Sequence, residues 1–468
     1  MKTKFSFILY LICYSFFILL TSCSTDDSLE EDPFVVAFKN LSINLSQITE
    51  EESITLVYSQ NALENGNFTV SIDASNAIYG KDFITIPAAE NNNIQLTIEE
   101  GQLENNIVFK KLNTLLDETT VITFTIASIN YSNSNIQGNT DFLINSSPSL
   151  GGSILPEVGG PNQQNQVFID LSNQNVTIKK RDSWDLGFYG GSNQRVAING
   201  SLYMAAKALE ATDIDSVNET DVIDLQREVA VGTFNEANQA YIDAPNGNIL
   251  ETAIDQISIH DDENPVYLLN LGYEVGTAIP NAGSVAVAGN QRGWKKIKIL
   301  WDGENYKLQY ADLNATTHKE ILIQKDANYN YKHFSFNTDA LVTIEPQKEK
   351  WDICFTVFTN IIEGAGSYGF SDFVVHNTKG NVAAYEINTN DFSYDDFSIT
   401  DVNNTSFSID QTSIGSNWRD VFSGGSVYAD RFYVIKDANN NIYKLKFLAI
   451  TNNDGERGHP EFEYELLL

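Results

Sequence analysis

The sequence Ser183-Trp184-Asp185-Leu186-Gly187-Phe188 decides the fold, because it has a counterpart in Lys350-Trp351-Asp352-Ile353-Cys354-Phe355. A short aromatic segment precedes each of the two, and Phe168 and Phe334 lie 16 and 17 residues before the respective tryptophans. Each Trp-Asp segment leads through a Gly-rich loop into another β-type run, and each copy ends in a predicted hairpin. The pattern therefore predicts a duplication of mostly antiparallel β structure.

The part of the 468-residue chain that precedes the duplication is also β-rich. From residue 34 to residue 145, short runs of alternating apolar and polar residues are separated by polar turns, which is typical of a β-sandwich. Residues 146–166 are rich in Ser, Pro, Gly, Asn and Gln, a composition that predicts a linker. We therefore expect an all-β fold, with the sandwich followed by two β domains at residues 167–325 and 326–468.

The first 22 residues have the pattern of a signal peptide. A basic start and an apolar run lead to Leu20-Thr21-Ser22-Cys23, which resembles the bacterial lipobox and implies lipidation of Cys23. The alternative is an ordinary secretory peptide that contains a cysteine. The acidic tether at residues 23–33 resembles the export tag of Bacteroidota surface lipoproteins. We expect an outer-membrane lipoprotein, exposed at the cell surface and held by its lipid anchor.

Composition excludes several classes of function. The chain has 29 Lys and Arg against 62 Asp and Glu, for a formal net charge of −33, which argues against a nucleic-acid partner.

After processing, Cys354 has no cysteine left to pair with, so we expect no disulfide and a buried, inert thiol. Residues 364–369 spell a dinucleotide fingerprint, but a β-type run follows where that motif needs a helix. We predict that the protein is not an enzyme.

The duplicated part resembles the HmuY family of Bacteroidota surface lipoproteins. The resemblance rests on the Phe-x-Phe strand at residues 334–336, the Trp-Asp strands and the Gly-rich loops. It also rests on the Tyr-x-Leu-x-Phe hairpin at residues 443–447 and the closing segment 455–464. Membership would imply tandem HmuY-like all-β domains, the first more divergent. It would also imply haem capture and transfer of the haem to an outer-membrane uptake system, such as a TonB-dependent transporter.

Studied members of that family hold the haem iron axially with a pair of histidines or methionines. The corresponding candidates here are His376, His333 and Met204, and we expect a pocket between loops around residues 364–378, with His376 directed inward. Neither copy shows an evident pair of such ligands. The alternative is therefore a haem-independent surface module that binds a glycan, a peptide or a protein partner.

The N-terminal unit resembles a Calx-beta domain. The resemblance starts at Gly80-Lys81-Asp82-Phe83 and continues through a Gly-containing turn to an acidic loop with Asp117 and Glu118. Some Calx-beta domains bind calcium through loop carboxylates, which makes Asp82, Asp117 and Glu118 calcium candidates. Because only part of the acidic pattern is present, a metal-free spacer is the favoured interpretation.

Overall fold

The computed structural model describes residues 32–113, 116, 119–422 and 426–468. The signal peptide, Cys23, nearly all of the acidic tether, Asp117 and Glu118 lie outside the described residues. The described part is all-β, as predicted: it consists of strands, 3-10 turns and the four-residue helix α2 (Glu219–Val222). No helix among the described residues is long and apolar enough to cross a membrane.

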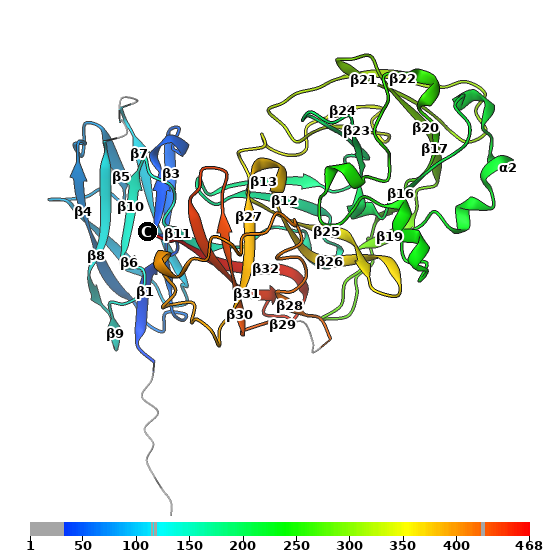
Figure 1. Cartoon of the computed structure of the whole chain (residues 1–468). Coiled ribbons are helices and arrows are strands. Elements are labelled where there is room, and N and C mark those ends of the chain that lie inside the picture. The colour runs from blue at the N-terminus through cyan, green and yellow to red at the C-terminus, as the bar shows by residue number, and fades with distance from the viewer. Residues whose placement is uncertain (1–31, 114–115, 117–118, 423–425) are drawn as a thin grey trace, which may run out of the picture.

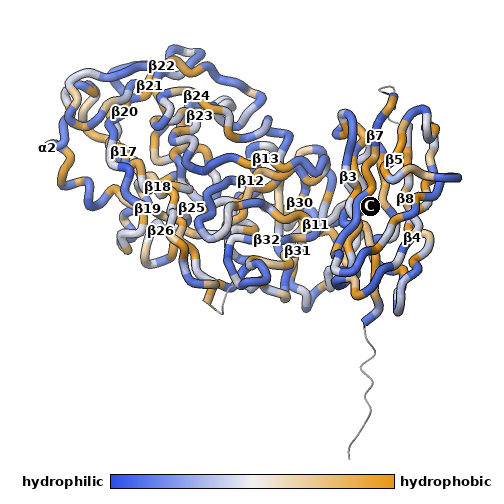
Figure 2. Tube along the Cα trace, turned by 180° about the vertical axis from the view of Figure 1, so that it is seen from behind, coloured by the Kyte–Doolittle hydropathy of each residue, from blue (hydrophilic) through white to orange (hydrophobic). Residues whose placement is uncertain are grey.

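The N-terminal unit is a sandwich of two five-stranded sheets, seen in blue and cyan in Figure 1. Alternate residues of its strands point into one core, as in β3, where Ile54, Leu56 and Tyr58 are buried between partly exposed neighbours. This alternation of apolar and polar positions is visible along the strands in Figure 2. One sheet has the order β5 (Phe83–Ile86), β7 (Glu104–Lys111), β3 (Glu51–Tyr58), β1 (Phe34–Phe38), β9 (Ser134–Asn135). The other has the order β2 (Ser42–Asn44), β10 (Asp141–Asn145), β8 (Val121–Asn130), β4 (Gly66–Ser75), β6 (Asn93–Ile98).

The remainder of the chain forms two five-stranded and two four-stranded sheets, with two short two-stranded ribbons, β18 with β19 and β28 with β29. One five-stranded sheet has the order β16 (Ala205–Ala208), β17 (Val266–Asn270), β20 (Trp294–Trp301), β21 (Asn305–Ala311), β22 (Lys319–Gln324). The other has the order β27 (Ala383–Asn388), β30 (Arg431–Lys436), β31 (Ile442–Thr451), β32 (Arg457–Leu466), β11 (Gly151–Ile154). One four-stranded sheet has the order β13 (Asn175–Lys180), β12 (Asn165–Asp170), β25 (Ile353–Ile362), β26 (Gly366–His376). The other has the order β15 (Val196–Ile198), β14 (Leu186–Tyr189), β23 (Tyr331–Ser335), β24 (Ala340–Val342). Each five-stranded sheet thus ends on a strand that directly precedes an aromatic strand, β22 before β23 and β11 before β12.

The four-stranded sheets do not follow the predicted division between residues 325 and 326. The aromatic strand of the first copy, β12, pairs with the Trp-Asp strand of the second, so that Phe168 lies opposite Cys354. Conversely, the aromatic strand β23 of the second copy pairs with β14 of the first, with Phe334 opposite Leu186. The two copies therefore exchange strands, and each central sheet is built from both.

The segment predicted as a linker, residues 146–166, is ordered by pairing on both sides. Its strand β11 closes the sheet of β32, with Gly151 opposite Glu465 and Gly152 opposite Tyr464. On the other side, the Leu41 amide of the sandwich donates to the Gly151 carbonyl at 3.0 Å. A Cβ on Gly151 would lie 2.2 Å from the Tyr464 carbonyl oxygen, so this close approach requires glycine. The glycines of the predicted linker instead allow tight strand packing.

Candidate functional site

Two tryptophans occupy equivalent places in the two interleaved halves. The Trp184 ring meets His333 edge-on, with ring centroids 4.7 Å apart, and the Trp351 ring meets Phe168 edge-on at 5.1 Å. In each pair, the tryptophan comes from one copy and its ring partner from the other. The strand exchange therefore turns the two Trp-Asp segments toward a common centre.

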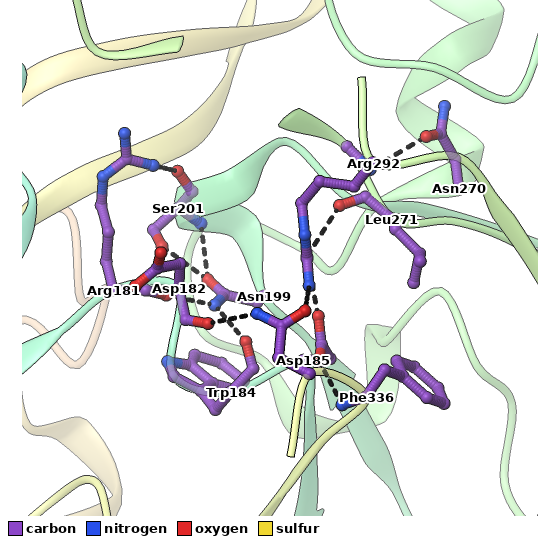
Figure 3. Close-up of polar contacts among 12 residues, drawn as sticks. Arg181, Asp182, Trp184, Asp185, Asn199, Ser201, Asn270, Leu271, Arg292 and Phe336 are labelled. Atoms are coloured by element: carbon purple, nitrogen blue, oxygen red, sulfur yellow. Dashed lines mark hydrogen bonds and ion pairs between the residues drawn. The ribbon is translucent and has the colours of Figure 1, made fainter. Parts of the chain in front are cut away.

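Each Asp beside these tryptophans ties its strand to the opposite copy. Asp352 accepts the Leu171 amide at 2.7 Å, and Asp185 accepts the Phe336 amide at 2.6 Å. Asp185, which is fully buried, also pairs with Arg292 at 2.7 Å, as Figure 3 shows. These contacts fix the exchange, because a buried carboxylate without partners is costly.

Two asparagines complete the repeated arrangement. Asn199 donates its amide to the carbonyls of Arg181 and Trp184 (Figure 3). Asn377 makes the same pair of bonds to the carbonyls of Lys348 and Trp351. Both asparagines also cap a short 3-10 turn through their side-chain oxygens. The tryptophans are thus held by hydrogen-bonded loops, and they serve as walls of a cavity as well as packing anchors.

A cavity of about 190 Å³ lies between the two halves. All three predicted haem ligands, His376, His333 and Met204, line it, and so do Trp184 and Trp351. Met204 is fully buried and also belongs to the hydrophobic core of the first copy. The structure therefore brings together residues that are far apart in the sequence, and it does so through the exchange of strands.

The position of this cavity differs from the predicted loop pocket. Residues 364–365 form the turn of the long hairpin of β25 and β26, and residues 366–376 form a strand. Of the segment 364–378, Val375, His376, Asn377 and Thr378 line the cavity. The Gly-rich tip lies at the other end of the strand, where the Gly364 amide donates to Glu236. Of the predicted loop pocket, the end with His376 lines the cavity and the Gly-rich tip does not, because glycine content does not reveal which end of a hairpin faces a cavity.

His376 is held in one tautomer by the backbone. Its Nε2 lies 3.2 Å from the Ser408 carbonyl oxygen, which can only accept, so Nε2 carries the proton and Nδ1 keeps a lone pair. Burial lowers the pKa of His376 to about 4, which keeps the ring neutral. Nδ1 is buried and has no hydrogen-bond partner among the described residues, and the same holds for Nε1 of Trp351. The cavity wall thus contains one unpaired acceptor and one unpaired donor.

His333 is also neutral, because burial lowers its pKa to about 3. Its ring packs between Trp184 and Tyr331, with centroid distances of 4.7 and 6.0 Å. Cys354 lines the cavity as well, and burial raises the pKa of its thiol well above the ordinary value. A thiol in this state is a poor nucleophile, in agreement with the expected inert cysteine.

Three titratable residues at the cavity were not anticipated. Glu345 is buried and accepts the Tyr331 amide at 2.6 Å, and burial raises its pKa to about 8. Asp243 accepts the amides of Ile198 and Ala253, each at 2.9 Å. Lys379 donates to the Gly247 carbonyl at 3.1 Å and lies over the Tyr331 ring. No sequence motif identifies these three residues as members of a site. They are recognised only because the folded structure brings them together at the cavity.

The calcium candidate Asp82 has a structural role. Its carboxylate accepts the Ile78 amide and the Asn113 side chain, both at 2.9 Å, and these bonds lower its pKa. Asp117 and Glu118 lie outside the described residues. Among the described residues, no group of three or more His, Cys, Asp or Glu side chains could hold a metal ion.

The interleaved sheets and the central cavity define an all-β protein built from two copies that exchange strands around a common centre. The family model of the HmuY protein matches residues 162–464 as one continuous region that spans both copies. The chain belongs to the HmuY family.

Comparisons with solved structures give matches of low identity. The apo form of the Calx CBD1 domain is 10% identical, with 24% of this chain and 96% of that chain covered and a TM-score of 0.20. The Calx CBD2 domain is 10% identical, with 24% and 83% covered and a TM-score of 0.20. A Bacteroides ovatus protein described as carbohydrate binding is 10% identical, with 73% and 97% covered and a TM-score of 0.16. No curated protein matches the chain.

Haem, which the family implies, can be tested against the cavity. His376 has the orientation of a metal-binding histidine, with its second ring nitrogen bonded to a backbone carbonyl. The volume of about 190 Å³, however, is below the ~300–1,000 Å³ of sites that hold drug-sized molecules. Glu345 and Asp243 add carboxyl groups to the wall. The cavity in this conformation does not fit haem.

Proposed function

We propose that this chain is a lipid-anchored protein of the bacterial outer-membrane surface that captures a ligand in the central cavity. The lipobox-like sequence at Cys23 and the acidic tether support the location, and membership of the HmuY family supports a surface-associated binding protein. Membership of the family is in keeping with a role in binding rather than in catalysis.

The unpaired atoms of the cavity wall carry this proposal. Nearly all buried polar atoms in proteins have hydrogen-bond partners, so an exception calls for an explanation. Among the described residues, nine buried side-chain atoms lack a hydrogen-bond partner, and two of them, Nδ1 of His376 and Nε1 of Trp351, belong to residues that line one cavity. A bound ligand would supply the missing partners.

A thermal-shift screen of residues 24–468 tests ligand capture. The probes are monosaccharides, nucleobases, amino acids and haemin, and we expect one class to raise the unfolding temperature in a saturable way. A ligand at 100 times its Kd stabilises the folded state by about 2.7 kcal/mol. Ala197 lines the cavity, so the larger side chain of Ala197→Leu should abolish the shift. Absence of any saturable shift, or an equal shift in this variant, would reject the proposal.

Haem capture, with transfer to a TonB-dependent outer-membrane transporter, is the second candidate function. The lone pair on His376 Nδ1 and the presence of His333 in the wall of the same cavity favour it. It requires the cavity to enlarge. Ile242, Ala244 and Thr252 line both the cavity and an outer groove of about 670 Å³, so movement of the segment 242–252 would join the two spaces.

Haemin titration of residues 24–468 tests this candidate directly. If haem binds through His376, a sharp and saturable Soret band forms and is lost in His376→Ala. His459→Ala is the matched control, because His459 is exposed and does not line the cavity. A band that His376→Ala retains rejects this residue as the ligand, and a response no greater than that of an unrelated protein rejects haem capture.

A further inference from the structure

Most polar side chains of the cavity wall are already engaged with the protein. Asn199, Asn330 and Asn377 hold backbone or side-chain partners, and Gln411 donates to the Pro245 carbonyl at 2.9 Å. They shape the wall and leave little hydrogen-bonding capacity for a ligand. Two polar atoms of wall residues, Nδ1 of His376 and Nε1 of Trp351, are buried and have no hydrogen-bond partner among the described residues.

The two unpaired atoms need opposite hydrogen-bonding partners. The Trp351 indole nitrogen can only donate a hydrogen bond, whereas Nδ1 of His376 can only accept one, because Nε2 holds the proton. A ligand that satisfies both needs an acceptor and a donor. A hydroxyl group provides both functions, and a molecule with several hydroxyls meets both positions without carrying charge.

The charged groups around the cavity offset one another. Lys379 is attracted to both Asp243 and Glu345, and these are the charged residues that face it from the packed segments of the wall. Burial favours the uncharged form of Glu345 at neutral pH, which leaves Asp243 opposite Lys379. The wall therefore has no surplus charge to pair with an ionic ligand, and an uncharged one avoids an unpaired buried charge.

The size and the aromatic walls define the rest of the ligand. An engineered protein cavity of about 150 Å³ holds benzene, so about 190 Å³ corresponds to one six-membered ring with its substituents. Trp184, Trp351 and Phe168 give this space flat apolar walls. Such walls pack against the C–H face of a ring while polar groups at the ring edge form hydrogen bonds.

We propose that the cavity binds a single uncharged sugar ring, either a free monosaccharide or the terminal unit of a glycan. This inference rests on the proposed role in ligand capture and names the chemical class of the ligand. The hydroxyls of the ring pair with Trp351 and His376, and its apolar face packs against the aromatic walls.

Isothermal titration calorimetry of residues 24–468 with glucose, galactose, mannose and N-acetylglucosamine tests the inference. We expect saturable one-to-one binding of at least one sugar. Trp351→Phe and His376→Phe should each weaken it about tenfold, the usual effect of losing one hydrogen bond. The methyl glycoside of the bound sugar distinguishes its source, since undiminished binding indicates the end of a glycan and loss indicates the free sugar.

The controls are Trp294→Phe and His459→Phe, which make the same exchanges away from the cavity and should bind as the unaltered chain does. Circular dichroism confirms that all four variants fold. Absence of binding by every sugar overturns the inference, and so does unchanged affinity in both cavity variants. If sugars fail while another class in the thermal-shift screen binds, ligand capture stands without the sugar assignment; if every class fails, both are rejected.

Discussion

Replacement of Asp185 by alanine is expected to lower the free energy of unfolding by about 3–5 kcal/mol, the cost of leaving one partner of a buried ion pair unpaired. The Asp185 side chain is fully buried and that of Arg292 is 7% exposed, with 2.7 Å between their charged atoms (Figure 3). The same substitution removes the acceptor of the Phe336 amide, which belongs to the other copy. Chemical denaturation followed by circular dichroism measures the loss.

Two variants show whether the buried charge causes this effect. Asp326→Ala removes a partly exposed carboxylate that pairs with Lys332 at 2.9 Å, and it should cost about 1 kcal/mol or less. The double variant Asp185→Asn with Arg292→Met keeps an acceptor for Phe336 and removes both charges, so it should be more stable than Asp185→Ala. A loss in Asp185→Ala no greater than that in Asp326→Ala would contradict the importance of this pair for the strand exchange.

The contribution of Glu345 to the stability of the protein is expected to fall as the pH rises from about 4.5 to about 8. Burial raises the pKa of Glu345 from 4.5 to about 8, so the folded protein binds this proton more tightly than the unfolded chain does. Stability from this group is therefore fully present below pH 4.5 and is lost as the pH rises through the folded pKa. The difference corresponds to about 5 kcal/mol at pH values above 8.

The variant Glu345→Gln isolates this contribution. Its amide cannot ionise but can still accept the Tyr331 amide, so its stability relative to the unaltered chain should increase between pH 5 and pH 8. Denaturation midpoints at several pH values measure the difference. Glu104→Gln changes the same group at an exposed strand position and serves as the control. A constant difference between Glu345→Gln and the unaltered chain over this pH range would show that Glu345 does not titrate as the buried environment requires.

The candidate site was only partly predictable. His376 and His333 could be selected because histidines are scarce in this chain, and both line the cavity together with Met204. Glu345, Asp243 and Lys379 could not, because the sequence contains 62 acidic and 29 basic residues and no local pattern separates these three. Their perturbed environment arises from burial by segments distant in the sequence.

The sequence by itself determined the all-β class, the N-terminal sandwich and the duplicated Trp-Asp strands. These features are local: alternation of apolar and polar residues specifies a strand with one buried face, and polar turns end it. The tertiary structure alone decided that β12 pairs with β25 and β14 with β23, and that β11 closes a sheet. A strand pattern specifies which side chains are buried but not which distant strand supplies the backbone partners, and here that choice creates the cavity.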